Sequence, residues 1–174
     1  MSDSKPPSYL FRPIVLAESE NDLPFLRELY ASTRRDEMKP SGWPKQEIED
    51  FLRQQFEAQH TFYMEQFAGA DFDVIVGENG APIGRLYLDE RDDEFRVIDI
   101  ALLPEFRGHG IGGKIMQEVI DRAFAADKAV RIHVEHNNTA MHLYKRLGFE
   151  MVEEQGVYHL MEIKPPGKNK ESAA

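Results

Sequence analysis

The 174-residue chain contains no cysteine, which excludes disulfide bonds, thiolate metal sites and a cysteine nucleophile. It also lacks any apolar run that approaches the ~20 residues of a membrane-spanning helix. The opening MSDSKPPSYL has no basic segment followed by an apolar one, as a secretory signal would. We therefore expect neither membrane insertion nor Sec-type secretion, and the cytoplasm is the expected compartment.

Basic residues are scarce: 21 Lys and Arg stand against 31 Asp and Glu, which gives a formal net charge of −10. A protein that binds duplex nucleic acid needs a basic face, so the charge balance argues against nucleic acid as a partner. It does not exclude a local basic pocket for an anionic ligand, and it leaves cationic partners open.

The length is that of one domain with tails. Residues 1–10 and 164–174 are polar and rich in Pro, Gly and charge, so we expect two mobile tails around a single domain at 11–163. In the first half, a short strand is predicted at 13–18. A helix follows from about Leu23 to Asp36, with Asp22 as its cap.

A second helix is predicted from Pro44 to near Gly69, because apolar residues recur at three- and four-residue steps. Three strands come next, and the Asn79-Gly80 pair predicts a hairpin between the first two. We place them at 72–76, 82–88 and 96–103.

The second half alternates helices and strands. A helix is expected from the glycine-rich segment after Pro104 to about Ala126, then a strand at 130–135 and a short helix capped by Asn138 and closed by Gly148. Two strands around Gln155-Gly156 complete the order β-α-α-β-β-β-α-β-α-β-β. This order predicts an α/β (α+β) fold with a mixed, mostly antiparallel sheet of about seven strands and helices on both faces.

A glycine-rich block opens the helix after the strand at 96–103. Glycines let backbone N–H groups face a ligand, and a helix N-terminus favours an anion. A turn without a ligand is the plain alternative. Gly108-x-Gly110-x-x-Gly113 matches the dinucleotide fingerprint by letter but stands too late in the chain, and a phosphate loop would need Ser or Thr where Ile115 stands. The block consists of Arg107, Gly108, His109, Gly110, Ile111, Gly112, Gly113 and Lys114.

Two segments together resemble the GNAT superfamily of acyl-CoA-dependent N-acyltransferases. Residues 107–112 are similar to its (Gln/Arg)-x-x-Gly-x-(Gly/Ala) motif, and the preceding Ile100-Ala101-Leu102-Leu103-Pro104-Glu105 resembles its fourth strand and exit. Residues 138–149 resemble its second signature: an Asn, then Leu-Tyr, then Leu-Gly-Phe. The likeness spans about 12–163. Gly42-Trp43 ahead of a long Gln- and aromatic-rich helix resembles an uncharacterised bacterial-type subset.

The resemblance implies an N-acetyltransferase that uses acetyl-CoA as co-substrate and transfers acetyl directly to an amine in a ternary complex. The family's fourth strand offers backbone groups to the acyl carbonyl and pantetheine, here Ile100, Ala101 and Leu102. The pyrophosphate would lie on the N–H groups of residues 108–113, with charge from Arg107 and Lys114, and Asn138 (or Asn137) would contact the pantetheine arm.

Three residues are the implied catalytic candidates. Tyr144 occupies the position from which the family protonates the leaving thiolate. Asp99 and His133 are candidate general bases, because Asp99 is polar within an apolar strand and His133 stands where some members place an acidic base. Packing roles for all three, and a water chain with no single base, remain alternatives.

No metal is expected, since the family uses none and the spacing of His109, His133, His136 and His142 repeats no zinc pattern. The acceptor is open: a small-molecule amine, or a protein lysine or N-terminus. The expected assembly is a monomer or homodimer. One rival from another class keeps the fold but binds acyl-CoA without turnover, as a sensor or interaction module. The other is a nucleotide-binding protein that uses the same glycines.

Overall fold

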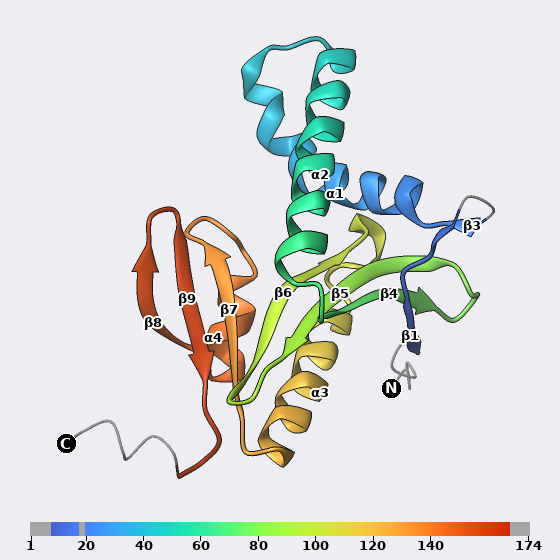
Figure 1. Ribbon diagram of the computed structural model, residues 1–174. Helices are drawn as coiled ribbons and strands as arrows, with labels where there is room; N and C mark the ends of the chain where they lie inside the picture. Colours follow the sequence, from blue (N-terminus) through green and yellow to red (C-terminus); the bar gives the residue numbers. More distant parts are fainter. Residues whose placement is uncertain (1–7, 18–19, 168–174) are drawn as a thin grey trace, which may run out of the picture. The chain divides into compact units, whose positions relative to one another are not determined.

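The computed structural model describes residues 8–17 and 20–167 of the chain (Figure 1). The mobile tail predicted at the N-terminus lies largely outside these residues, and so does most of the one predicted at 164–174. The described chain divides into two compact units. Unit 1 comprises 8–87 and 100–109, and unit 2 comprises 88–99 and 110–167.

Seven strands form one sheet in the order β1-β4-β5-β6-β7-β9-β8. β6 and β7 pair in parallel, whereas β1–β4, β7–β9 and β8–β9 are antiparallel pairs, so the predicted mixed sheet of seven strands is confirmed. A parallel pair needs a crossover connection, and α3 supplies it. The strands are β1 (Tyr9–Pro13), β4 (Asp71–Gly77), β5 (Pro82–Glu90), β6 (Glu94–Leu102), β7 (Ala129–Glu135), β8 (Glu150–Gln155) and β9 (Tyr158–Ile163).

Unit 1 packs two helices around β4 and β5. α1 (Leu23–Met38) and α2 (Lys45–Gln66) contact each other, and a short 3-10 turn, η1 (Lys39–Ser41), follows α1. Tyr63 of α2 meets Tyr87 of β5 edge to face, with ring centroids 6.1 Å apart. The unit's core is apolar and buried: Leu26, Leu29, Leu52, Phe56, Val74, Ile75, Ile83 and Tyr87.

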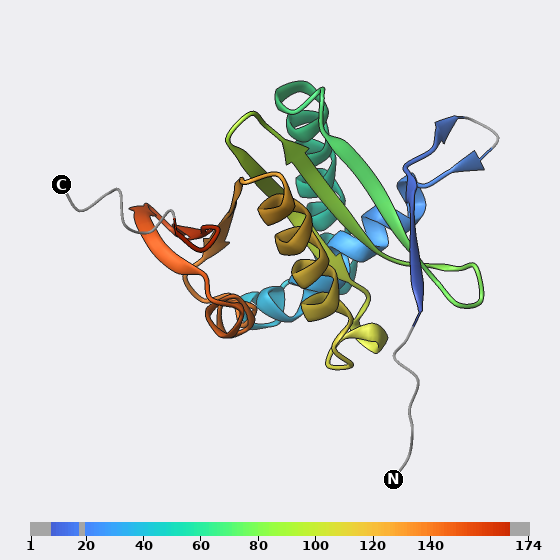
Figure 2. The same cartoon turned by 90° about the horizontal axis from the view of Figure 1, so that it is seen from below.

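The first strand begins earlier than the sequence pattern predicted. β1 starts at Tyr9 and pairs with β4 from Tyr9–Gly77 to Pro13–Asp73. The predicted segment 13–18 instead contributes β2 (Leu16–Ala17), which forms a small hairpin with β3 (Glu20–Asn21), drawn in blue beside β1 in Figure 2. Local alternation could not distinguish the two positions, because the partner strand lies some 60 residues away in sequence.

Asp22 stands at the N-cap of α1 as predicted, but its carboxylate does not cap the helix. Both oxygens accept hydrogen bonds from the Arg12 guanidinium at 2.8 Å, and Oδ2 also accepts one from the Val15 N–H at 2.7 Å. Asn21 Oδ1 accepts the Leu23 N–H instead. Asp22 therefore ties the end of β1 to the start of α1.

We expect Asp22→Asn to cost about 1–3 kcal/mol, because it removes the charge of a buried carboxylate that accepts both hydrogen bonds from the half-exposed Arg12 guanidinium. Hydrogen bonds from Arg12 hold the pKa of Asp22 below its ordinary value. A lowered folded-state pKa contributes stability that is present above pH ~4 and lost as the pH falls through the folded pKa. Urea unfolding of both proteins at pH 7 and pH 3 should show a smaller difference at pH 3. An equal difference at both would contradict the ion pair's role.

Unit 2 packs α3 (Ile111–Ala125) against β7 and also contains the short α4 (Met141–Leu147). The register Phe95–Val130 and Val97–Ile132 places these four side chains on one face of the β6–β7 pair, where they are buried. Ile115, Met116, Val119, Ile120 and Ala123 of α3 are also buried, and their three- and four-residue spacing places them on one face of the helix.

None of the helices within the described residues is both long and apolar enough to cross a bilayer.

Candidate active site

The glycine-rich block forms a turn that enters α3. After β6 come a 3-10 turn, η2 (Pro104–Phe106), and then Gly108 and Gly110, both in the left-handed region with φ of 75° and 82°. Gly110 is the N-cap of α3, and the Lys114 N–H donates to its carbonyl at 3.0 Å. Only glycine adopts these φ values without strain, so the turn requires both residues.

The first turn of α3 presents backbone N–H groups that the helix itself cannot satisfy. The N-cap residue, Gly110, has no side chain with which to cap them. An added Cβ at Gly112 would meet nothing within 4 Å, and Gly112 has no left-handed φ. Neither backbone conformation nor packing demands glycine at 112. The amides of the first turn of a helix suit a phosphate or another anion.

The Arg107 side chain is engaged with its own unit. Its Nε donates to the Leu102 carbonyl at 2.9 Å, and Nη2 lies 3.3 Å from Ser32 Oγ of α1. Arg107 therefore links the end of β6 to α1, a role that the sequence pattern did not indicate. Lys114 and His109 are exposed.

β6 leaves its parallel partner before either strand ends. Their register runs only from Glu94–Ala129 to Val97–Ile132, while β6 continues to Leu102 and β7 to Glu135. Backbone groups of β6 beyond Val97 are thus outside the β6–β7 ladder. They belong to the segment that includes Ile100, Ala101 and Leu102.

Tyr144 lies on α4 and is 4% exposed. Burial raises the pKa of its phenol well above the ordinary value, and the negative charge of Asp99 raises it further. Its ring packs beside Phe149, with centroids 5.7 Å apart. The raised pKa keeps the phenol protonated well above neutral pH, so its hydroxyl is available to donate a hydrogen bond or a proton in the field of the Asp99 carboxylate.

The two candidate bases stand on opposite faces of the β6–β7 pair. Asp99 is two residues beyond the buried Val97 and shares its face, whereas His133 follows the buried Ile132 and points the other way. His133 is exposed, its Nε2 lies 3.0 Å from Gln155 Oε1, and its Nδ1 is 3.5 Å from Arg96 Nη1. The structure thus associates Asp99, not His133, with Tyr144.

Asn138 is exposed in the segment between β7 and α4. Its Oδ1 accepts the Ala140 N–H at 2.8 Å, in a side-chain turn that precedes the helix. The N-cap of α4 is Ala140, so the prediction that Asn138 itself caps the helix was wrong by two residues. The side-chain turn takes the place of that cap. Asn137 is also exposed.

Two polar clusters were not predicted from the sequence, because elements far apart in the chain assemble them. In unit 1, Arg85 of β5 is 2% exposed and donates to Gln59 Oε1 of α2 at 2.8 Å, with its guanidinium over the Tyr87 ring. In unit 2, buried Glu94 and Glu162 both pair with Arg131. The one signal that could have indicated Arg85 is a charged residue isolated within an apolar strand.

Comparison with known proteins gives the family. The sequence model described as "Acetyltransferase (GNAT) family" matches residues 25–149. An uncharacterised protein of Mycobacterium leprae (strain TN) is 38% identical over 60 residues, which make up 34% of this chain and 16% of that protein. The chain thus matches only about a sixth of the length of this curated relative.

Two solved structures share the fold. The PaiA N-acetyltransferase of Thermoplasma acidophilum, in complex with coenzyme A, superposes with a TM-score of 0.66 at 18% identity, covering 90% of this chain and 99% of that one. A protein from Corynebacterium glutamicum, described as histone acetyltransferase HPA2 and related acetyltransferase, gives 0.59 at 23% identity, covering 93% and 97%. Because the match covers residues 25–149, well over half of the sequence, the chain belongs to the GNAT acetyltransferase family.

Proposed function

We propose that the protein transfers an acetyl group from acetyl-CoA to an amine. The observation that carries this proposal is the turn at 108–113, where two left-handed glycines lead into α3 and the N-cap residue is itself a glycine, with no side chain to cap the first amides. The pyrophosphate of CoA suits this position because fixed amides and the helix dipole attract an anion locally. Such a local site explains how a chain of net charge −10 can bind a polyanion.

The remaining predicted residues have complementary roles. Backbone groups of Ile100, Ala101 and Leu102, beyond the β6–β7 ladder, would hydrogen-bond the acyl carbonyl and the pantetheine arm. Asn138 would contact the arm through its side-chain amide, since Oδ1 is engaged by Ala140. The coenzyme A complex of the Thermoplasma relative supports this choice of co-substrate.

The chemistry is a direct transfer. The neutral amine nitrogen forms a bond to the acetyl carbonyl carbon, the carbon–sulfur bond breaks, and the amine loses a proton while the thiolate gains one. Tyr144, held neutral by burial, is the proposed proton donor to sulfur. Asp99 or His133 accepts the amine proton, directly or through water. The pH–rate profiles of the Asp99→Ala and His133→Ala variants identify which of the two residues is the general base. If neither profile is shifted, neither residue is the base.

The first experiment is thermal unfolding of the full chain with acetyl-CoA, CoA, NAD and ATP in parallel. A ligand that binds only the native state at 100 times its Kd adds about 2.7 kcal/mol, which is a readily measured shift. We expect shifts with acetyl-CoA and CoA alone. A shift with NAD or ATP instead, or with none of the four, would overturn the proposal. Binding of acetyl-CoA without transfer across an amine panel would favour a non-catalytic sensor.

A matched pair of variants at Gly112 tests the site itself. We expect Gly112→Ala to keep CoA binding, because the family motif accepts Ala there, and to stabilise α3 by about 0.5–1 kcal/mol. Gly112→Asp also suits a helix N-terminus, so the fold should remain intact, but its charge would repel the pyrophosphate and weaken binding by about tenfold or more. Isothermal titration with CoA measures the affinity of each variant. Unchanged affinity in the Asp variant would place the phosphates elsewhere.

A further inference from the structure

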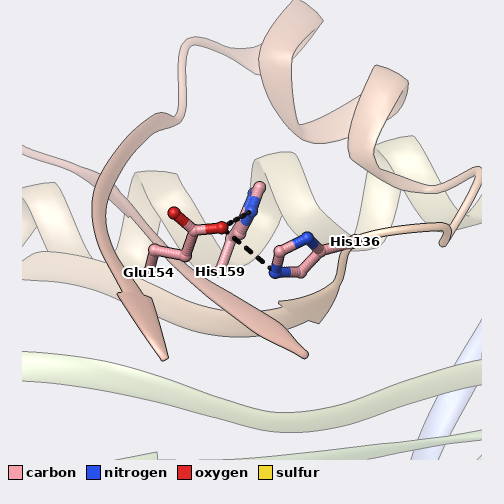
Figure 3. Close-up of side chains that lie close together, drawn as sticks. All are labelled: His136, Glu154 and His159. Carbon is pink, nitrogen blue, oxygen red and sulfur yellow. Dashed lines mark ion pairs between the residues drawn. The ribbon is translucent and has the colours of Figure 1, made fainter. Parts of the chain in front are cut away.

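A cluster of two imidazoles and one carboxylate lies in unit 2, and none of its three residues has a role in the acetyl transfer proposed above. It consists of His136, Glu154 and His159 (Figure 3). His136 comes directly after β7, Glu154 is on β8, and His159 is on β9, the strand between them. No local spacing reveals the cluster, because strand pairing brings the three residues together.

The backbone positions the three side chains. His159 is the register partner of Val134 on β7 and of Glu154 on β8. The His136 N–H donates to the Val157 carbonyl at 3.1 Å, which holds His136 beside the start of β9. The β8–β9 register shifts between Met151 and Glu153, just before Glu154. The cluster therefore rests on a hydrogen-bonded sheet.

The donor atoms converge on one point. Nε2 of His136 and Nε2 of His159 each lie 3.7 Å from the same oxygen, Glu154 Oε1, and the two imidazole ring centroids are 3.9 Å apart. All three ligand atoms lie within 4.8 Å of one another. Figure 3 shows both rings turned toward the carboxylate.

These separations are too long for good hydrogen bonds, and they suit a metal ion. A tetrahedral zinc ion with bonds of about 2.0–2.1 Å separates its donors by about 3.3 Å, a few tenths of an ångström less than the 3.7 Å observed here. Two imidazoles and a carboxylate form a donor set that zinc and similar divalent ions prefer over Mg²⁺ or Ca²⁺. Side-chain exposures of 40%, 63% and 19% for His136, Glu154 and His159 leave the donors accessible to an ion from solution.

We propose that His136, Glu154 and His159 form a binding site for a divalent zinc-class cation, with water in the fourth position. The ion cross-links the end of β7 to the β8–β9 hairpin. The site is independent of the glycine turn, so its existence does not depend on the proposed acetyl transfer.

The test uses the full chain without a polyhistidine tag, and Zn²⁺ as the probe. Isothermal titration of the metal-stripped protein should give one equivalent of Zn²⁺ and a raised unfolding temperature. His136→Ala, His159→Ala and Glu154→Gln should each weaken binding by about tenfold or more, because each removes one of three ligands. His142→Ala is the matched control, since His142 is an exposed histidine outside the cluster and should leave affinity unchanged.

Co²⁺ supplies a second measurement. Bound at this site in four-coordinate geometry, it should give the intense visible absorption of tetrahedral cobalt, and Zn²⁺ should displace it. No Zn²⁺ binding by the wild type, or equal binding by the wild type and the Glu154→Gln and His136→Ala variants, would overturn the proposal. CoA titration of the same variants keeps the two conclusions apart, because loss of zinc should leave CoA affinity unchanged.

Discussion

Tyr144→Phe should lower kcat about a hundredfold, with little change in the affinity for CoA. The substitution removes only the phenolic hydroxyl, and proton transfer by a positioned side chain contributes about 10²–10⁴-fold to such reactions. The ring remains to pack beside Phe149, so the fold and the glycine turn should be undisturbed. Steady-state kinetics with an amine found by screening, together with CoA titration, separates the two effects. An unchanged kcat would remove Tyr144 from the mechanism and leave it a packing role.

The raised pKa of Tyr144 gives the same variant a signature that needs no substrate. Burial, followed by the Asp99 charge, keeps the folded phenol neutral beyond its ordinary pKa near 10. The protonated phenol of Tyr144 therefore makes its full contribution to the free energy of unfolding below pH ~10. This contribution is lost as the pH rises toward the pKa of the folded state. The wild type should lose about 1.4 kcal/mol per pH unit from this residue above pH 10.

Urea unfolding at pH 9, 10 and 11 measures this difference. The Phe variant lacks the ionisation, so its stability should fall less steeply than that of the wild type above pH 10. The other tyrosines titrate in both proteins and cancel in the comparison. Parallel curves would show that the folded Tyr144 ionises as readily as the unfolded one, which contradicts its burial beside Asp99.

The sequence predicted well those features that are encoded locally. The Asn79-Gly80 hairpin is present, with Gly80 at φ 80°, and α3 follows the glycine turn at the predicted position. The apolar stripe of α3 is buried because its three- and four-residue spacing places it on one face. These signals lie within a few residues of the structure that they specify.

The parts that sequence reasoning missed depend on partners distant in the chain. Asp22 was a reasonable cap by local pattern, yet Arg12, on a strand whose register is set by β4, takes its carboxylate. In the sequence His136 stands near other histidines at spacings that match no zinc pattern, whereas its neighbours in space are Glu154 and His159. The register of β6 against β7 is also what shows that Asp99 and His133 lie on opposite faces of this strand pair. Register determines which side chains meet, and one sequence contains little information about it.

Gly84→Ala should destabilise the protein by about 2–3 kcal/mol, in the range of overpacked interiors. Gly84 of β5 is buried against the end of β6, and an added Cβ would lie 2.3 Å from the Ala101 carbonyl oxygen and 2.8 Å from Leu102 Cδ2. The first of these atoms is backbone, so no side-chain rotation relieves the clash. The end of β6 must move, and with it the residues proposed to bind pantetheine.

Gly69→Ala is the matched control for this prediction. Gly69 is exposed in the turn after α2, has no left-handed φ, and an added Cβ there would meet nothing within 4 Å. It should leave both stability and CoA affinity unchanged, whereas Gly84→Ala should lower both, because one methyl group displaces Ala101 and Leu102 together. If Gly84→Ala loses stability but keeps full CoA affinity, the end of β6 has no part in binding. If it loses neither, the close approach of β5 and β6 at Gly84 is not a constraint on the fold.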